Sequence, residues 1–125
     1  MSEKILVIED DVVLRKGIIT ILELEGFDVI FAIDGEEGER MIREENPRMV
    51  ILDLMLPKKK GVDILADLNS SKEFANIPVY VLTVVGKMDT VADCLEAGAK
   101  GYFIKPDTSL KQIAEVAKRE FALKQ

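Results

Sequence analysis

Acidic, hydroxyl and basic side chains stand directly after four apolar runs of this 125-residue sequence. Glu9 and Asp10 follow the first of these runs, Asp53 the second, Thr83 the third and Lys105 the last. An ionised carboxylate at the end of the run 50–52 is costly to desolvate, and aspartate has a poor strand propensity. Asp53 therefore needs either a counter-charge or a chemical role.

The charges of these residues narrow the chemistry. Two carboxylates about 4 Å apart repel by roughly 4 kcal/mol at an effective dielectric constant near 20, so converging acids raise one another's pKa unless a cation lies between them. Lys105 supplies one positive charge, and Mg²⁺, which binds carboxylates, waters and phosphate oxygens, supplies two more. The set predicts a site for magnesium and a phosphoryl group. Asp53 is then the nucleophile, and Thr83 donates a hydrogen bond to the bound phosphoryl.

Five short apolar runs are the predicted β-strands. Four of them are nearly continuous, which is typical of strands covered on both faces in a parallel sheet. The exception is interrupted by Asp28 and is expected at an edge. The runs cover residues 5–8, 27–32, 49–52, 79–82 and 102–104.

Five helical patterns alternate with these runs. Asp34 with Glu37 forms a capping pair for the second, and Asp107, Thr108 or Ser109 is expected to cap the last. Repeated strand-helix pairs imply right-handed crossovers and one doubly wound α/β sheet, whose ligands bind at the carboxyl ends of the strands. The predicted helices cover residues 11–25, 34–46, 61–71, 88–98 and 110–121.

Composition excludes several classes of protein. The chain has no histidine, which excludes imidazole bases, Ser-His triads and His-ligated zinc. A net charge of −6 argues against direct nucleic-acid binding by this domain. The single cysteine, Cys94, predicts no internal disulfide, and no apolar signal or membrane-spanning run is present, so we expect a cytoplasmic protein without membrane contacts.

Four segments together carry a family resemblance. In order and spacing, the chain resembles the response-regulator receiver domain of two-component signalling, the CheY-like superfamily, in the segments ILVIEDD, VILDLMLPKKKG, VYVLT and GAKGYFIKP. The resemblance spans residues 5–106. It implies one receiver domain over residues 1–125, with a flavodoxin-like five-stranded parallel sheet in the order 2-1-3-4-5 and five helices on its two faces.

The resemblance also implies roles for individual residues. Asp53 is the phosphoacceptor, and Asp10 is a direct ligand of Mg²⁺ (or Mn²⁺), with Glu9 acting partly through water. The backbone carbonyl of Met55 is a further ligand. Lys105 binds the phosphoryl group, and its peptide bond to Pro106 is expected to be cis.

By the same resemblance, the chain is a signalling phosphoacceptor. A sensor histidine kinase or phosphotransfer protein donates the phosphoryl group, and the domain slowly hydrolyses its own aspartyl phosphate. Thr83 is the switch hydroxyl and Tyr102 the switch aromatic, which together repack the surface that a downstream target or output domain binds. A homodimer through the fourth and fifth helices is a further possibility, and the sequence leaves open whether the receiver stands alone or belongs to a longer regulator.

Simpler interpretations remain for single residues. Glu9 and Asp10 could cap the first helix, Asp53 could be a turn residue, and Lys105 could be an ordinary ion-pair partner. Tyr102 could be edge-strand packing. The residues 58–60, all lysine, are expected to form a solvated turn.

Three other functions are alternatives to that of a receiver. A haloacid-dehalogenase-type phosphatase needs a second acid two residues after the nucleophile, where this chain has Met55. A nucleotide-binding flavodoxin or P-loop protein needs a Gly- or Thr-rich phosphate loop after the first strand, where residues 9–11 are acidic and repel phosphate. A receiver-like binding module that never takes phosphate is a third possibility.

Overall fold

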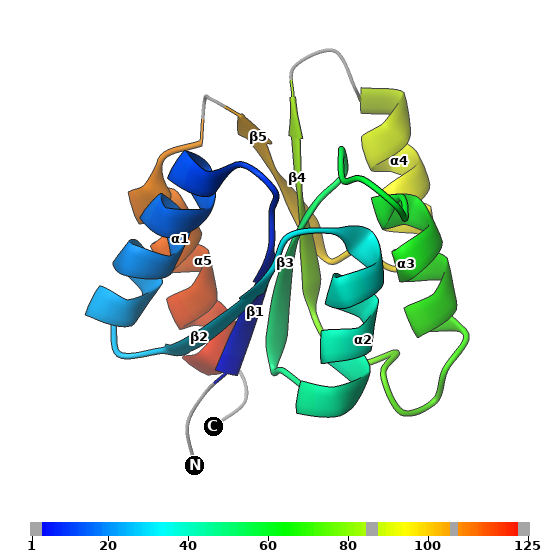
Figure 1. Ribbon diagram of the computed structural model, residues 1–125, viewed down its shortest axis with the longest axis horizontal. Coiled ribbons are helices and arrows are strands. Elements are labelled where there is room, and N and C mark those ends of the chain that lie inside the picture. The colour runs from blue at the N-terminus through cyan, green and yellow to red at the C-terminus, as the bar shows by residue number, and fades with distance from the viewer. Residues whose placement is uncertain (1–3, 85–87, 106–107, 123–125) are drawn as a thin grey trace.

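The computed structural model describes residues 4–84, 88–105 and 108–122. Within these residues, five strands alternate with five helices in an α/β sandwich of three layers (Figure 1). The strands are β1 (Lys4–Ile8), β2 (Asp28–Ala32), β3 (Met49–Asp53), β4 (Val79–Val84) and β5 (Gly101–Lys105). The helices are α1 (Val12–Leu24), α2 (Gly35–Glu45), α3 (Gly61–Asn69), α4 (Met88–Glu96) and α5 (Leu110–Ala122). The predicted order of elements is confirmed.

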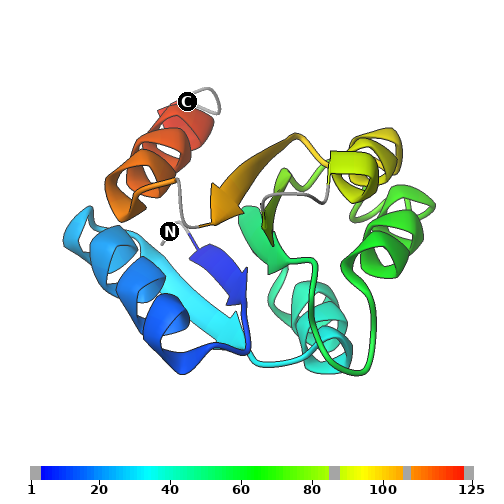
Figure 2. The same cartoon turned by 90° about the horizontal axis from the view of Figure 1, so that it is seen from above.

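The sheet is parallel throughout, and its strands lie in the order β2-β1-β3-β4-β5. This order and the edge position of β2 are as predicted. Helices α1 and α5 cover one face, and α2, α3 and α4 cover the other (Figure 2). Among the described residues, no helix combines the length and the apolar character needed to cross a membrane.

The sheet separates two apolar cores. Alternate residues of each strand point to opposite faces, so β3 contributes Val50 and Leu52 to the core under α2, α3 and α4, and Met49 and Ile51 to the core under α1 and α5. All five residues of β3 are buried. This double burial explains why the central strands read as continuous apolar runs. Cys94 is part of the first core and is a free thiol.

Polar caps set the helix starts. The Asp11 carboxylate accepts hydrogen bonds from the backbone of Val13 and Leu14, which begins α1. Asp34 accepts from Glu37 N at 2.8 Å at the start of α2, as predicted. Ser109 Oγ accepts from the Gln112 backbone at 3.2 Å before α5, which selects Ser109 over Thr108; Asp107 lies outside the described residues.

Several boundaries differ from the predicted ones, and those of β2, β3 and β4 have clear physical reasons. Strand β2 begins at Asp28, because Phe27 N donates to Leu22 O at the end of α1 instead of joining the sheet. Strands β3 and β4 each run further than predicted, since Asp53 pairs with Leu82 and Val84 pairs with Lys105. Asp53 and Thr83 are therefore strand residues, held by the sheet rather than by a turn.

Candidate functional site

The acidic residues and Lys105 lie together at the carboxyl edge of the sheet. Glu9 directly follows β1, whose Ile8 pairs with Leu52 of the neighbouring β3, and Asp53 is the last residue of β3. Lys105 is the last residue of β5. Because β1 lies between β2 and β3, the strand order reverses beside these acids, which is where open parallel sheets bind ligands.

Three carboxylates converge at this edge. Oxygen atoms of Glu9, Asp10 and Asp53 all lie within 4.8 Å of one another. Glu9 is fully buried and Asp53 is 3% exposed, whereas Asp10 faces solvent. A set of three carboxylates with one side open to water matches the oxygen ligands and retained waters that Mg²⁺ prefers, so the donor set fits this ion.

Lys105 bridges the two buried acids. Its Nζ lies 2.8 Å from Glu9 Oε1 and 3.2 Å from Asp53 Oδ2. Burial by itself would lower the pKa of Lys105, but its hydrogen bond to Glu9 and the charges of Asp53 and Glu9 raise the pKa above 10.5. The lysine is therefore charged at neutral pH.

One lysine does not neutralise this cluster. Burial, together with the neighbouring Asp53, raises the pKa of Glu9 from 4.5 to about 7, although Lys105 and the Asp11 backbone act in the opposite direction. Near neutral pH, the Glu9 carboxyl group is therefore partly protonated. A second cation at the site would displace that proton.

Backbone groups orient the two buried carboxylates. Met55 N–H donates to Asp53 Oδ1 at 3.0 Å, and Asp11 N–H donates to Glu9 Oε2 at 3.2 Å. Asp53 thereby has one oxygen on Met55 and the other on Lys105. The alternative that Glu9 and Asp10 cap the first helix is wrong, because Asp11 is the cap.

Thr83 and Tyr102 occupy different environments. Thr83 is 2% exposed, and its hydroxyl donates to the neighbouring Val84 carbonyl at 3.5 Å, which is long for such a bond. It lies one residue beyond Leu82, the partner of Asp53 in the sheet. Tyr102 is 41% exposed on the edge strand β5, so its ring is not core packing. Pro106, and with it the expected cis bond, lies outside the described residues.

Arg15 is a site residue that the sequence analysis missed. Its Nη1 donates to the carbonyl oxygens of Glu9 at 3.0 Å and Asp10 at 3.5 Å, and its guanidinium lies 4.8 Å from the centre of the Phe31 ring. Arg15 therefore reaches back from α1 and holds the backbone that carries the acidic pair. An arginine one turn into a helix that follows strand-end acids is the signal that could have identified it.

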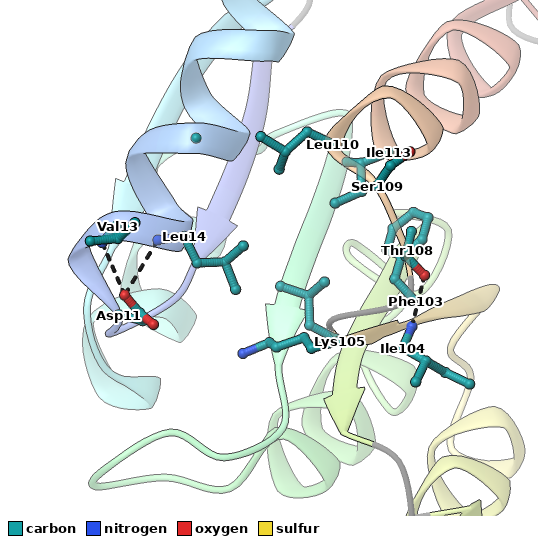
Figure 3. Close-up of a pocket in the computed structure, with 12 residues that line it drawn as sticks. Asp11, Val13, Leu14, Phe103, Ile104, Lys105, Thr108, Ser109, Leu110 and Ile113 are labelled. Atoms are coloured by element: carbon teal, nitrogen blue, oxygen red, sulfur yellow. Dashed lines mark hydrogen bonds between the residues drawn. The ribbon is translucent and has the colours of Figure 1, made fainter.

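A cavity of about 500 Å³ opens next to the site, between the starts of α1 and α5 (Figure 3). Its walls are mostly apolar, with Leu14, Leu110 and Ile113 among them, and Lys105 stands at its edge. Glu9, Asp10 and Asp53 do not line it. The acid cluster and the cavity are separate features that share Lys105.

Comparisons with known proteins agree with this architecture. Residues 5–117 match the family model of the response regulator receiver domain. The chain is 38% identical over 105 residues to the probable transcriptional regulator ycf27 of Porphyridium aerugineum, covering 84% of this chain and 42% of that protein. It is 36% identical over 121 residues to the DNA-binding response regulator MtrA of Mycobacterium leprae, covering 95% of this chain and 52% of that protein.

Solved structures are similar over nearly the whole chain. A response regulator receiver domain protein from Clostridium thermocellum superposes with a TM-score of 0.87 at 29% identity, covering 99% of this chain and 97% of that one. A CheY-like receiver domain protein from Methanospirillum hungatei gives a TM-score of 0.89 at 25% identity, covering 98% of this chain and 96% of that one. The chain spans about half the length of the curated relatives it matches.

Proposed function

Because the chain belongs to the response regulator receiver domain family of two-component systems, we propose that Asp53 accepts a phosphoryl group from a phosphohistidine. The donor is a sensor histidine kinase or a phosphotransfer protein, and the reaction depends on Mg²⁺ or Mn²⁺. The observation that carries this proposal is the convergence of three carboxylates and Lys105 at the carboxyl edge of the sheet. The proposal makes the domain a signalling phosphoacceptor.

Asp53 is the nucleophile in this proposal. The hydrogen bond from Met55 N–H to Oδ1 holds the carboxylate in one orientation, which reduces the entropy lost on reaching in-line geometry. One carboxylate oxygen forms a bond to phosphorus while the phosphorus–nitrogen bond of the donor breaks. The electron pair of that bond returns to the imidazole nitrogen.

Four residues would hold the metal ion: Glu9, Asp10 and Asp53 through carboxylates, and Met55 through its backbone carbonyl. The close approach of the three carboxylates supports this set. Asp10 is the exposed member and is proposed as a direct ligand, while Glu9 acts partly through water. When bound, the ion would offset the charge of the carboxylates and of the phosphoryl oxygens.

Lys105 is proposed to bind the phosphoryl group after transfer. In the unphosphorylated protein its ammonium lies between Glu9 and Asp53, 3.2 Å from Asp53 Oδ2. A phosphoryl group on Asp53 adds negative charge within reach of this ammonium. Lys105 then exchanges a carboxylate contact for a phosphoryl contact without leaving the site.

Thr83 and Tyr102 are proposed as the switch. The Thr83 hydroxyl has only a long bond to the Val84 carbonyl, so it can turn toward a phosphoryl oxygen at little cost. Tyr102, which is 41% exposed on β5, would follow by moving inward once Thr83 has turned. The movement repacks the surface formed by α4, β5 and α5, a two-state element biased by the phosphoryl charge.

The switched surface needs a partner that responds to it. The relatives include DNA-binding response regulators, whereas the net charge of −6 disfavours direct contact between this domain and nucleic acid. We therefore propose that the switched surface acts on an output domain or a separate protein target, in the cytoplasm. Self-association through α4 and α5 and slow self-hydrolysis of the aspartyl phosphate belong to the same proposal.

Intact-mass measurement tests the phosphoacceptor role. Incubation with acetyl phosphate and Mg²⁺ is expected to add the mass of one phosphoryl group to the wild type and to Asp63→Asn, a control aspartate exposed on α3. Asp53→Asn and samples with EDTA are expected to gain nothing. A wild type that stays unmodified with both Mg²⁺ and Mn²⁺, or an Asp53→Asn variant that is still modified, contradicts the proposal.

A further inference from the structure

In the loop between β3 and α3, Lys58 and Lys60 are exposed, as the solvated turn predicted from the three lysines requires, but Lys59 is not. Lys59 Nζ lies 2.8 Å from Glu39 Oε1 on α2 and also forms an ion pair with Asp67 on α3, and its side chain is only 26% exposed. Hydrogen bonds to Asp67 and then Glu39 raise the pKa of Lys59 above 10.5, so it is charged. Lys59 thus ties two neighbouring helices to the loop.

The loop is also in close backbone contact with the start of α2. Gly35 N–H donates to Pro57 O at 3.2 Å, and a Cβ atom on Gly35 would lie 2.2 Å from Lys59 O. Lys58, immediately before Lys59, has a φ of 71°, a left-handed backbone that lysine rarely adopts. The path of the loop is therefore imposed by contacts with α2 and not by local preference.

This loop carries the Met55 backbone of the site. Met55 N–H donates to Asp53 Oδ1 at 3.0 Å. At the far end of the loop, a Cβ atom on Gly61 would lie 2.8 Å from Leu54 Cδ2, so both ends pack closely on each other. A change in the position of Lys59 has little room to be absorbed before it reaches Leu54 and Met55.

We propose that Lys59 is a positioning residue of the phosphoacceptor site. Through its ion pairs with Glu39 and Asp67, it holds the 54–60 loop in the conformation that places the Met55 backbone on Asp53. The metal-binding part of this inference rests on the proposed function, whereas the orientation of Asp53 by Met55 does not. Lys59 acts through the loop and touches neither the phosphoryl group nor the ion.

An electrostatic role and a positioning role of Lys59 predict opposite changes in cation affinity when the lysine is replaced. Loss of a positive charge near an acidic cluster strengthens cation binding through space. Loss of a positioning contact weakens it, typically by 10- to 100-fold for groups that orient metal ligands. Lys60 is a matched control, because it is exposed in the same loop, carries the same charge and makes no side-chain capping bond to α3.

The first measurement is independent of any metal. Hydrogen exchange of the Met55 amide, followed by NMR in EDTA, is expected to be about tenfold faster in Lys59→Met than in the wild type, and unchanged in Lys60→Met. Exchange of the core Val50 amide, which donates to Pro78 O, serves as the internal reference. An unchanged ratio of Met55 to Val50 exchange in Lys59→Met overturns the proposal.

The second measurement is the Mg²⁺ dissociation constant from calorimetry. Lys59→Met is expected to bind about tenfold more weakly, Lys59→Arg to bind as the wild type does, and Lys60→Met to bind equally or slightly more tightly. If Lys59→Met fails to fold, Glu39→Gln removes one ion pair and is expected to show the same changes in smaller size. If Lys59→Met loses stability but keeps the Mg²⁺ affinity and the Met55 exchange rate of the wild type, then Lys59 has only a structural role. That result overturns the proposal.

The two proposals fail differently. A wild type that binds no Mg²⁺ and takes no phosphoryl group contradicts the proposed function, while Met55 exchange still decides whether Lys59 positions the loop. Normal phosphorylation of the wild type with identical behaviour of Lys59→Met and Lys60→Met contradicts only the role of Lys59.

Discussion

Two buried glutamates lie in different regions of the molecule and differ in their surroundings. Glu9, at the carboxyl edge of the sheet, contacts Lys105 at 2.8 Å but also lies beside Asp53. Glu120, on α5, accepts from Tyr80 OH at 2.6 Å and from Lys100 Nζ at 2.7 Å. Both side chains are almost completely buried, at 0% and 3% exposure.

The partners of each glutamate explain the difference. Tyr80 and Lys100 both donate to Glu120, so its charge is matched and α5 is joined to β4 and to the start of β5. The pKa of Tyr80 is raised by burial and by its bond to Glu120, so the phenol remains a donor at every ordinary pH. At Glu9, acids outnumber bases. A lysine–glutamate pair is thus structural where donors match acceptors, and marks a ligand site where negative charge is in excess.

The largest effect is expected from replacing each glutamate with glutamine. In EDTA at pH 8, Glu120→Gln should lower the free energy of unfolding by about 1.5 kcal/mol, because two bonds to a charged acceptor are weakened. Glu9→Gln should raise it by about 1 kcal/mol, because one of two neighbouring buried carboxylates is removed. Urea denaturation of both variants measures the difference. Equal losses of stability would erase the distinction between the two regions.

The second largest effect is a pH dependence of folding stability that comes from Glu9 and not from Glu120. Its pKa is about 7 in the folded protein and 4.5 when unperturbed, so the folded state holds a proton that the unfolded state releases. The contribution of Glu9 to the free energy of unfolding, in the absence of metal, is therefore largest at or below about pH 4.5. It falls, on the order of 1 kcal/mol, as the pH rises through about 7. Urea midpoints from pH 4.5 to 8 measure this fall.

Two variants and the metal serve as controls for this dependence. The fall should disappear in Glu9→Gln, persist in Glu120→Gln, and be reversed by saturating Mg²⁺, which favours the ionised carboxylate. A fall of the same size in Glu9→Gln would assign the titration to another group.

The smallest effect concerns backbone strain at the two ends of the sheet. Lys58, in the site loop, has a φ of 71°, and Asn46, at the opposite end after α2, has a φ of 46°. Lys58→Gly should raise stability by about 0.5 kcal/mol, since strain relief exceeds the added chain entropy and the 3.5 Å ion pair of the exposed Lys58 with Asp34 contributes little. Asn46→Gly should gain less, because asparagine tolerates this conformation better. A larger gain at Asn46, by thermal denaturation, would contradict this ranking.

Much of the fold was predictable because the signals are local. Continuous apolar runs predicted buried parallel strands, and helical spacing with a cap such as Asp34 predicted helices, since side-chain periodicity is a property of each element alone. The sites at strand ends followed from topology. At Gly17, in contrast, only the structure shows that a Cβ atom would meet Leu110 Cδ1 at 3.1 Å, so α1 approaches α5 closely.

The pairings across elements were not predictable. Lys59 bonds to Glu39 across 20 positions, and Tyr80 bonds to Glu120 across 40. Glu120 stands beside Phe121 in a helix whose pattern contains no sign that a charged residue is buried. These contacts depend on how helices sit on the sheet, which a single sequence does not specify.

The sequence by itself determined the order of strands and helices, and it placed Glu9, Asp10, Asp53 and Lys105 at strand ends, because hydrophobic periodicity and strand termini are read along the chain. Only the tertiary structure decided how those charges balance. Burial, which raises the pKa of Glu9 to about 7, and the contact of Lys105 with Glu9 at 2.8 Å both arise from atoms distant in sequence. Electrostatic free energy depends on distance and burial in three dimensions, and neither exists until the chain has folded.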